Sequence, residues 1–246
     1  MNSAFHRCLA IALCAGSLLL AGCSQQGSTP APTAAQRQAQ AQNADAARNL
    51  ETYRQLLRIG NDQMAVSIGQ EIVSQFPGSD AAKEVQKTLP AIERRYRENS
   101  EKARLAALWE YQVSPMAGGT QSTAAIYNSH PSGNDRVQLV LRRHSSWGQS
   151  VFLYGSKPGF VCHRICRIAT TVDGKPFQIK AFAPPSGEPA LMLVDDKAFL
   201  AMLPKAKKIA MDVTLADGEK KLTLVYEVGG FDPSRWQPVP RHRKKK

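Results

Sequence analysis

The chain has 246 residues, and its 32 Lys and Arg against 20 Asp and Glu give a formal net charge of +12. This length allows one large or two small folded domains and excludes a longer array of domains. The excess of positive charge favours anionic partners.

The first 22 residues have the pattern of an export signal. Residues 1–7 are polar with one cation, Arg7, and residues 8–22 are uncharged and mostly apolar. That run suits the apolar core of a signal and is shorter than the roughly 20 residues of a membrane span. We therefore predict a signal peptide over residues 1–22.

The apolar run ends in Leu20-Ala21-Gly22-Cys23. This stretch resembles the lipobox of bacterial lipoproteins, which implies cleavage before Cys23 and attachment of diacylglycerol and a further acyl chain, such as palmitate, to that residue. Several acyl chains anchor stably, because each buried CH₂ contributes about 0.8 kcal/mol. By the same resemblance Ser24, in place of Asp, favours the periplasmic face of the outer membrane. The alternative is a plain cleaved signal with an accidental cysteine.

The next segments change in composition. Residues 24–43 are rich in Gln, Ala, Ser and Pro and lack large apolar side chains, so residues 23–43 are predicted to be a flexible tether. Residues 44–108 carry apolar side chains at steps of three and four, which is typical of helices. Breaks at residues 60–62 and 77–80 predict three helices, with Ser79 or Asp80 as a cap. Pro90 predicts a kink.

Part of this helical segment has a repeat-like spacing. Gly60, Ala65, Ile72 and Pro77 resemble the second half of a tetratricopeptide repeat, over about 35 residues. The resemblance implies a surface for protein contact. Such repeats need three or more units to stand alone. The alternatives are therefore a helical hairpin packed on its neighbour or on a partner, and a true peptide-binding groove.

Residues 109–231 contain short alternating runs separated by turns, which is typical of antiparallel strands. Asp173-Gly174 and Asp217-Gly218 predict hairpins, and residues 197–203 predict one short helix. The fold class is therefore α+β, a tetratricopeptide-like helical hairpin followed by an antiparallel β-sandwich-like domain, and the strand pattern leaves a partly closed barrel as the alternative. The predicted strands are 107–113, 123–127, 136–142, 150–154, 166–172, 176–181, 190–194, 208–215 and 221–228.

The same residues resemble an uncharacterised bacterial envelope domain, over about 120 residues. That resemblance implies a fold and no activity. Its anchors here include Trp109, Tyr111, Leu139, Leu141, Arg142, Gly148, Cys162, Cys166, Asp173, Gly174, Phe199, Tyr226 and Gly229.

Of the five cysteines, Cys162 and Cys166 remain after removal of the signal and lipidation of Cys23. An even pair in an exported protein predicts a disulfide. The alternatives are a redox-active pair and a metal site with His163. Three ligands within five residues make a poor tetrahedral site, so we predict no metal and no cofactor.

Four residues form the candidate binding surface: Arg142, Arg143, His144 and Trp147. Cations beside an aromatic ring are common where proteins bind sugars, anions or other proteins. The alternative is a solvated strand end. Residues 232–246, which finish in five cations among six residues, are predicted to be a disordered basic tail.

No catalytic motif is present: there is no His-Glu-x-x-His, Gly-x-Ser-x-Gly or phosphate-binding loop. The sequence therefore predicts a non-enzymatic, lipid-anchored binding or scaffold protein that holds a protein partner near the outer membrane. The alternatives are a module that binds peptidoglycan or another anionic polymer or lipid, and an envelope hydrolase with an unrecognised site. Because the chain is predicted to be exported, no nucleic-acid partner is predicted.

Overall fold

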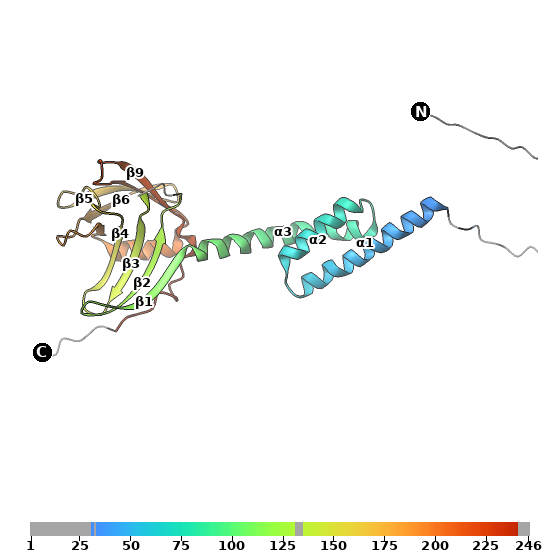
Figure 1. Ribbon diagram of the computed structural model, residues 1–246, viewed down its shortest axis with the longest axis horizontal. Helices are drawn as coiled ribbons and strands as arrows, with labels where there is room; N and C mark the ends of the chain where they lie inside the picture. The colour runs from blue at the N-terminus through green and yellow to red at the C-terminus, as the bar shows by residue number, and fades with distance from the viewer. Residues whose placement is uncertain (1–30, 32, 131–134, 241–246) are drawn as a thin grey trace, which may run out of the picture. The chain divides into compact units, whose positions relative to one another are not determined.

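The computed structural model describes residues 31, 33–130 and 135–240. Over these residues helices are followed by one antiparallel sheet of nine strands (Figure 1). This confirms the predicted α+β class. The predicted signal peptide, Cys23 and the last six residues, 241–246, lie outside the described residues.

Three helices precede the sheet. They are α1 (Ala34–Arg58), α2 (Asp62–Gln75) and α3 (Asp80–Ala107). The side chains of Asn61 and Ser79 cap α2 and α3 by accepting hydrogen bonds from the backbone amides of Met64 and Ala82. Both caps lie at the predicted breaks, and α3 continues through Pro90.

The start of α1 differs from the predicted boundary. The helix begins at Ala34, within the segment predicted to be a flexible tether, and residues 34–43 are exposed along it. Ala and Gln favour helix on the backbone alone, so this stretch forms helix without burying a core. A shared apolar core follows, made by Ala46, Leu50, Tyr53, Leu56, Ala65, Ile72, Ala81, Ala82, Val85, Leu89 and Ile92.

Each predicted strand overlaps one observed strand. The strands are β1 (Trp109–Met116), β2 (Gly119–Tyr127), β3 (Gln138–His144), β4 (Gly148–Tyr154), β5 (Cys166–Val172), β6 (Lys175–Phe182), β7 (Ala190–Leu193), β8 (Ile209–Thr214) and β9 (Lys221–Tyr226). They pair in the order β1-β2-β3-β4-β7-β6-β5-β8-β9. This is one hydrogen-bonded sheet, so the prediction of a sandwich of two sheets is not confirmed.

The sheet curls around its own core. The backbone amide of Ser129 donates to the carbonyl of Val225 (2.6 Å), and the Tyr226 hydroxyl donates to the carbonyl of Val137 (3.4 Å). These bonds join β9 to the connection between β2 and β3, although several strands separate them in the pairing order. One face of the sheet is therefore turned inward along its whole width.

The two faces of the sheet differ because successive side chains of a strand point to opposite sides. In β3, Leu139 and Leu141 belong to the large core, whereas Val140 belongs to a smaller apolar cluster. We call these sides the core face and the outer face. The short helix α4 (Asp196–Met202), capped by Asp195, and the turn η2 (Leu203–Lys205) add Phe199 and Leu203 to the core face.

Residues 232–240 do not behave as the predicted tail. Trp236 is 3% exposed and belongs to the core face, and its indole Nε1 donates to the carbonyl of Ser122 (3.1 Å). The Asp232 amide donates to the Tyr111 hydroxyl (2.7 Å). The folded domain therefore extends past residue 231, because this segment covers apolar side chains at the edge of the core.

The end of α3 contacts the turn η3 (Val228–Gly230). Gly230 packs so closely on the backbone of Leu105 that a Cβ there would overlap it. Arg104 bonds both carboxylate oxygens of Glu227, at 2.7 and 3.0 Å. Among the described residues, no helix combines the length and apolar character needed to cross a membrane.

Candidate functional site

The strand alternation separates the four predicted surface residues. Arg142 and His144 lie on the outer face of β3, and Arg143 lies between them on the core face. Trp147 lies in the turn that joins β3 to β4, before Gly148, which has a φ of +81°. The structure therefore brings three of the four residues together.

Arg143 has a structural position. Its guanidinium lies 3.7 Å from the ring centroid of Trp236, and its Nη1 donates to the backbone carbonyl of that residue (2.6 Å). Burial lowers the pKa of Arg143. This side chain fixes the segment after β9 to the sheet, and it faces away from the other members of the predicted surface.

His144 and Trp147 form a stacked pair. Their ring centroids are 3.8 Å apart and their planes differ by 11°. His144 is buried, and its Nδ1 accepts hydrogen bonds from the backbone amides of Ser146 and Trp147, both at 3.1 Å. Trp147 remains 54% exposed. The histidine thus holds the turn in place and presents the indole to solvent.

A neighbouring turn holds this arrangement. The amide of Thr120 donates to Ser145 Oγ (3.1 Å), and Ser146 Oγ donates to the carbonyl of Gly118 (2.6 Å). A Cβ at Gly119 would overlap Ser145 Oγ. The turn between β3 and β4 is therefore fixed against the turn between β1 and β2.

Arg142 lies between two aromatic rings. Its guanidinium carbon is 4.9 Å from the Phe152 centroid and 5.3 Å from the Trp147 centroid, within the range of cation–π attraction. Its Nε donates to Ser150 Oγ (3.2 Å). Burial lowers the pKa of Arg142, and the negative charge of Glu188 opposes that shift. Within the described part of the chain, no carboxylate forms a salt bridge with it.

A groove of about 370 Å³ runs beside Arg142 on the outer face. We call it the outer groove. Its apolar floor includes Ala125, Val140, Phe152 and Met192, which form a small cluster. Polar side chains surround this floor: Glu110, Gln112, Gln121, Thr123, Gln138, Arg142, Tyr154 and Glu188.

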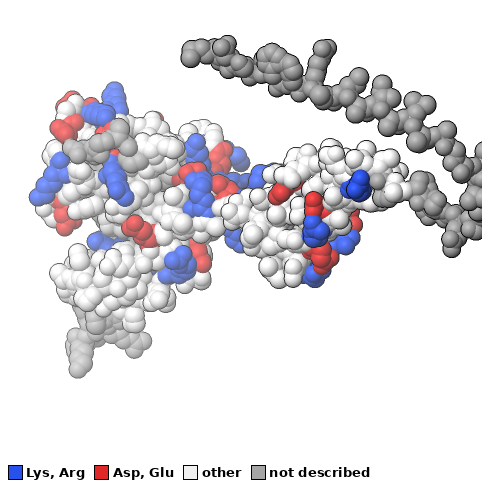
Figure 2. All heavy atoms as spheres, turned by 45° about the vertical axis from the view of Figure 1, so that its right-hand side comes forward, with Lys and Arg blue, Asp and Glu red and all other residues white. Residues whose placement is uncertain are grey.

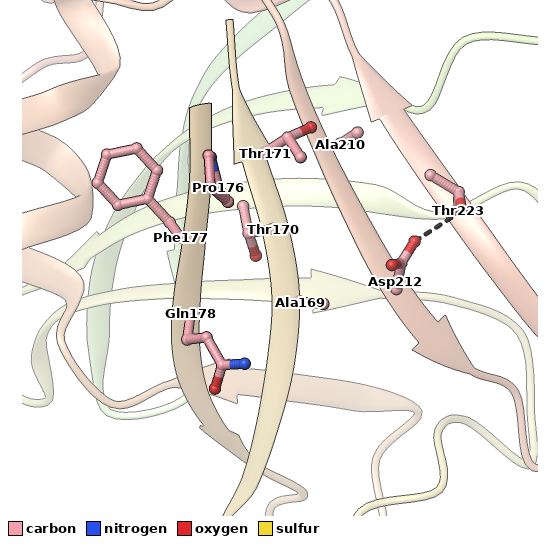
Figure 3. A pocket seen from close by; sticks show the side chains of 9 residues that line it. All are labelled: Ala169, Thr170, Thr171, Pro176, Phe177, Gln178, Ala210, Asp212 and Thr223. Carbon is pink, nitrogen blue, oxygen red and sulfur yellow. Dashed lines mark hydrogen bonds between the residues drawn. The ribbon is translucent and has the colours of Figure 1, made fainter. Parts of the chain in front are cut away.

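A second hollow, of about 410 Å³, lies on β5, β6, β8 and β9 (Figure 3). Small side chains line most of it, and Phe177 extends at one side. Its one carboxylate, Asp212, accepts a hydrogen bond from the Thr223 hydroxyl (2.6 Å). The only carboxylate among the described residues of the lining is therefore already hydrogen-bonded to Thr223 on the neighbouring strand.

A third hollow, of about 550 Å³, lies where α1 meets α2. Tyr96 and Ala103 of α3 line it together with the turn residues from Ile59 to Gln63. Ile59 is 71% exposed, and Met64, at the start of α2, is 52% exposed. We call Ile59 and Met64 the apolar tip.

The predicted disulfide is present. Cys162 and Cys166 are bonded, with their Cα atoms 5.4 Å apart, at the start of β5. Between them Ile165 is 62% exposed. The described residues contain no group of three or more His, Cys, Asp or Glu side chains that could hold a metal ion.

Comparison with known proteins gives no family. No family model matches the chain, and no curated protein matches it. Among similar solved structures is the crystal structure of invasion associated protein b from Bartonella henselae, at 20% identity and a TM-score of 0.36, over 52% of this chain and 87% of that one. Nothing about function follows from a similarity of that extent.

Several residues of the site are absent from the sequence-based prediction. Ser150 and Phe152 face Arg142 across the β3–β4 pair, and Glu188 reaches the groove from the segment before β7. Ser150 and Phe152 follow from alternation once the hairpin register is known. Glu188 does not, because nothing local indicates that β7 lies beside β4.

Proposed function

We propose that this chain is a non-enzymatic binding protein of the cell envelope, anchored through lipid on Cys23 to the periplasmic face of the outer membrane. In this proposal the segment α1–α3 is a tetratricopeptide-like hairpin that holds a protein partner. The lipobox resemblance at Leu20 to Cys23 supports the anchor.

The observation that carries the partner role is the apolar tip. Charged side chains of both signs are intermixed over the helices (Figure 2), and pairs such as Arg54 with Glu84 satisfy them. Ile59, which lines the hollow, and Met64, one residue after the lining residue Gln63, are large apolar side chains exposed on this surface. Exposed apolar groups next to a concavity are typical of protein contact sites.

A photo-crosslinking amino acid placed at Ile59 or at Met64 tests this role in the native organism. We expect one envelope protein to be crosslinked at both positions and to be lost when Met64→Glu is combined with the label at Ile59. The control label replaces Gln86, which is exposed on α3 of the same segment. Equal crosslinking at residue 86, or none at residues 59 and 64, contradicts the proposal.

A second candidate function is binding of an anionic envelope polymer by the sheet. The specific observation is the exposed Trp147 ring beside the half-buried Arg142 guanidinium. Co-sedimentation of the chain without its lipid with purified peptidoglycan sacculi tests it. Recovery in the pellet supports this candidate, and recovery in the supernatant alone rejects it.

A further inference from the structure

Arg142 is a half-buried cation without a carboxylate partner among the described residues. Its guanidinium is half-buried against Phe152 and Trp147, and Ser150 bonds only its Nε. No carboxylate lies within salt-bridge distance among the described residues. Charged groups removed from water are normally paired. The outer groove therefore has an electrostatic preference for a negative group at this end.

The remainder of the groove has a different preference. Its floor of Ala125, Val140 and Phe152 is apolar, and two carboxylates, Glu110 and Glu188, lie on its rim. A matching ligand carries an anion at Arg142, small apolar groups over the floor, and a cation or donor toward Glu188. A short peptide with mostly small side chains, a free carboxylate and one side-chain amine has this pattern.

The size of the groove fits such a peptide. The lining comes from the adjacent strands β1, β2, β3, β4 and β7, which span about 19 Å at roughly 4.8 Å between strands. Four extended residues span about 14 Å. The volume of about 370 Å³ lies within the range of small-ligand pockets.

Trp147 adds a second element of recognition. Its ring is exposed, stacked on the buried His144, and located next to Arg142 at the end of the groove. A rigid indole offers a flat apolar surface with little loss of entropy on binding. The C–H face of a sugar ring packs on such a surface, so a sugar joined to the peptide completes the match.

We propose that the outer groove and Trp147 bind a muropeptide, the unit of peptidoglycan in which a short zwitterionic peptide is attached to an amino sugar. The sugar ring stacks on Trp147, a peptide carboxylate pairs with Arg142, and an ammonium group on a peptide side chain faces Glu188, because the amino end of the peptide is used in the bond to the sugar. This inference rests on the second candidate function and is independent of the partner at the apolar tip.

Isothermal titration of the chain from Ser24 onward with a purified disaccharide-tetrapeptide tests the proposal. We expect binding that weakens at least tenfold in Arg142→Gln and in Trp147→Ala, and severalfold in Glu188→Gln. Arg167→Gln, exposed on β5 outside the groove, is the matched control and should bind as the unaltered chain does. The peptide alone and the disaccharide alone should each bind at least tenfold more weakly.

Two results overturn the inference: no binding of the disaccharide-tetrapeptide, or equal binding by Arg142→Gln and the control. Circular dichroism of each variant separates lost binding from lost folding, and Glu188→Gln, on the exposed rim, keeps the test open if Arg142→Gln does not fold. If the variants still sediment with sacculi, the polymer-binding function stands and only this site is wrong. If the unaltered chain does not sediment either, the second candidate function fails with it.

Discussion

Gly119 lies where two turns of the sheet meet. It has no side chain, so Ser145 can approach closely enough to accept a hydrogen bond from the amide of Thr120. The same contact fixes the turn that carries Trp147. At the scale of single residues, the exposed indole is therefore held by a glycine and a serine on neighbouring turns.

The close approach predicts non-additive substitutions. Gly119→Ala should destabilise the chain by about 1–3 kcal/mol, because the new methyl group must displace Ser145 Oγ. Ser145→Ala alone should cost about 1 kcal/mol for the lost hydrogen bond. Urea unfolding followed by tryptophan fluorescence measures both, since all three tryptophans follow residue 108. The double variant should cost clearly less than the two losses added together, and strict additivity would contradict the proposed contact.

Arg142 and Arg143 show what could be predicted at residue scale. The sequence places them side by side, and the period of two along a strand already assigns them to opposite faces. The prediction that Arg142 and Arg143 belong to the same binding surface is inconsistent with that period. Arg143 is the one that faces the core, where it contacts Trp236. The sequence does not indicate that Trp236 is buried, because polar and basic residues surround it.

At the scale of elements, local turn signals predict where the strands lie along the chain, but they do not predict which strands pair with each other. Asp173-Gly174 and Asp217-Gly218 join hairpin partners as predicted. The insertion of β7 between β4 and β6 depends on pairing between segments far apart in the chain. For the same reason, one curled sheet could not be distinguished from a sandwich by its strand pattern.

The segment after β9 is an element of the folded domain, which predicts a sharp effect of truncation. Removing residues 232–246 should lower the free energy of unfolding by about 3–5 kcal/mol, and Trp236→Ala should lower it by a similar amount. Both changes remove a buried aromatic side chain and its contacts with Ser122 and Arg143. Removing residues 241–246 alone is the control and should change stability by less than about 0.5 kcal/mol. Equal stability of the two truncated chains would contradict the burial of Trp236.

The contact between α3 and η3 predicts a pH dependence. The hydrogen bonds from Arg104 hold the pKa of Glu227 below its usual value of 4.5. A lowered carboxyl pKa stabilises the fold at neutral pH, and this stabilisation is lost as the pH falls from about 4.5 through the lowered value. Glu227→Gln should therefore cost about 0.5–1 kcal/mol at pH 7, a modest amount because the pair is partly exposed.

Urea unfolding at several pH values measures this difference between Glu227→Gln and the unaltered chain. The difference should shrink steadily below pH 4.5, as Glu227 of the unaltered chain gains its proton. Glu98→Gln, exposed on α3, the helix that carries Arg104, is the matched control and should show no such trend. A difference that stays constant down to pH 3 would show that the Arg104 ion pair does not stabilise the fold.

At the scale of the whole molecule, the proposals depend on an anchor that keeps the binding surfaces beside the envelope. The proposal gives the chain two means of association with a membrane: lipid on Cys23, and the basic residues that end the sequence. They differ in physical character. Acyl burial is insensitive to salt, whereas the attraction of Lys and Arg to anionic lipids is screened within about 3 Å at 1 M salt.

That difference makes the lipid anchor testable by fractionation. The unaltered chain should remain with the outer membrane after a wash in 1 M salt. Cys23→Ser, exported on a signal peptide that is cleaved without a lipobox so that residues 8–22 do not stay attached, should be released by that wash, because screened basic residues cannot hold it alone. Replacing both Cys162 and Cys166 with serine is the control for loss of a cysteine, and this variant should remain bound, since their disulfide lies in the sheet. If Cys23→Ser also resists the wash, the chain is held by contacts other than the lipid, and the partner at the apolar tip becomes the first of these to remove.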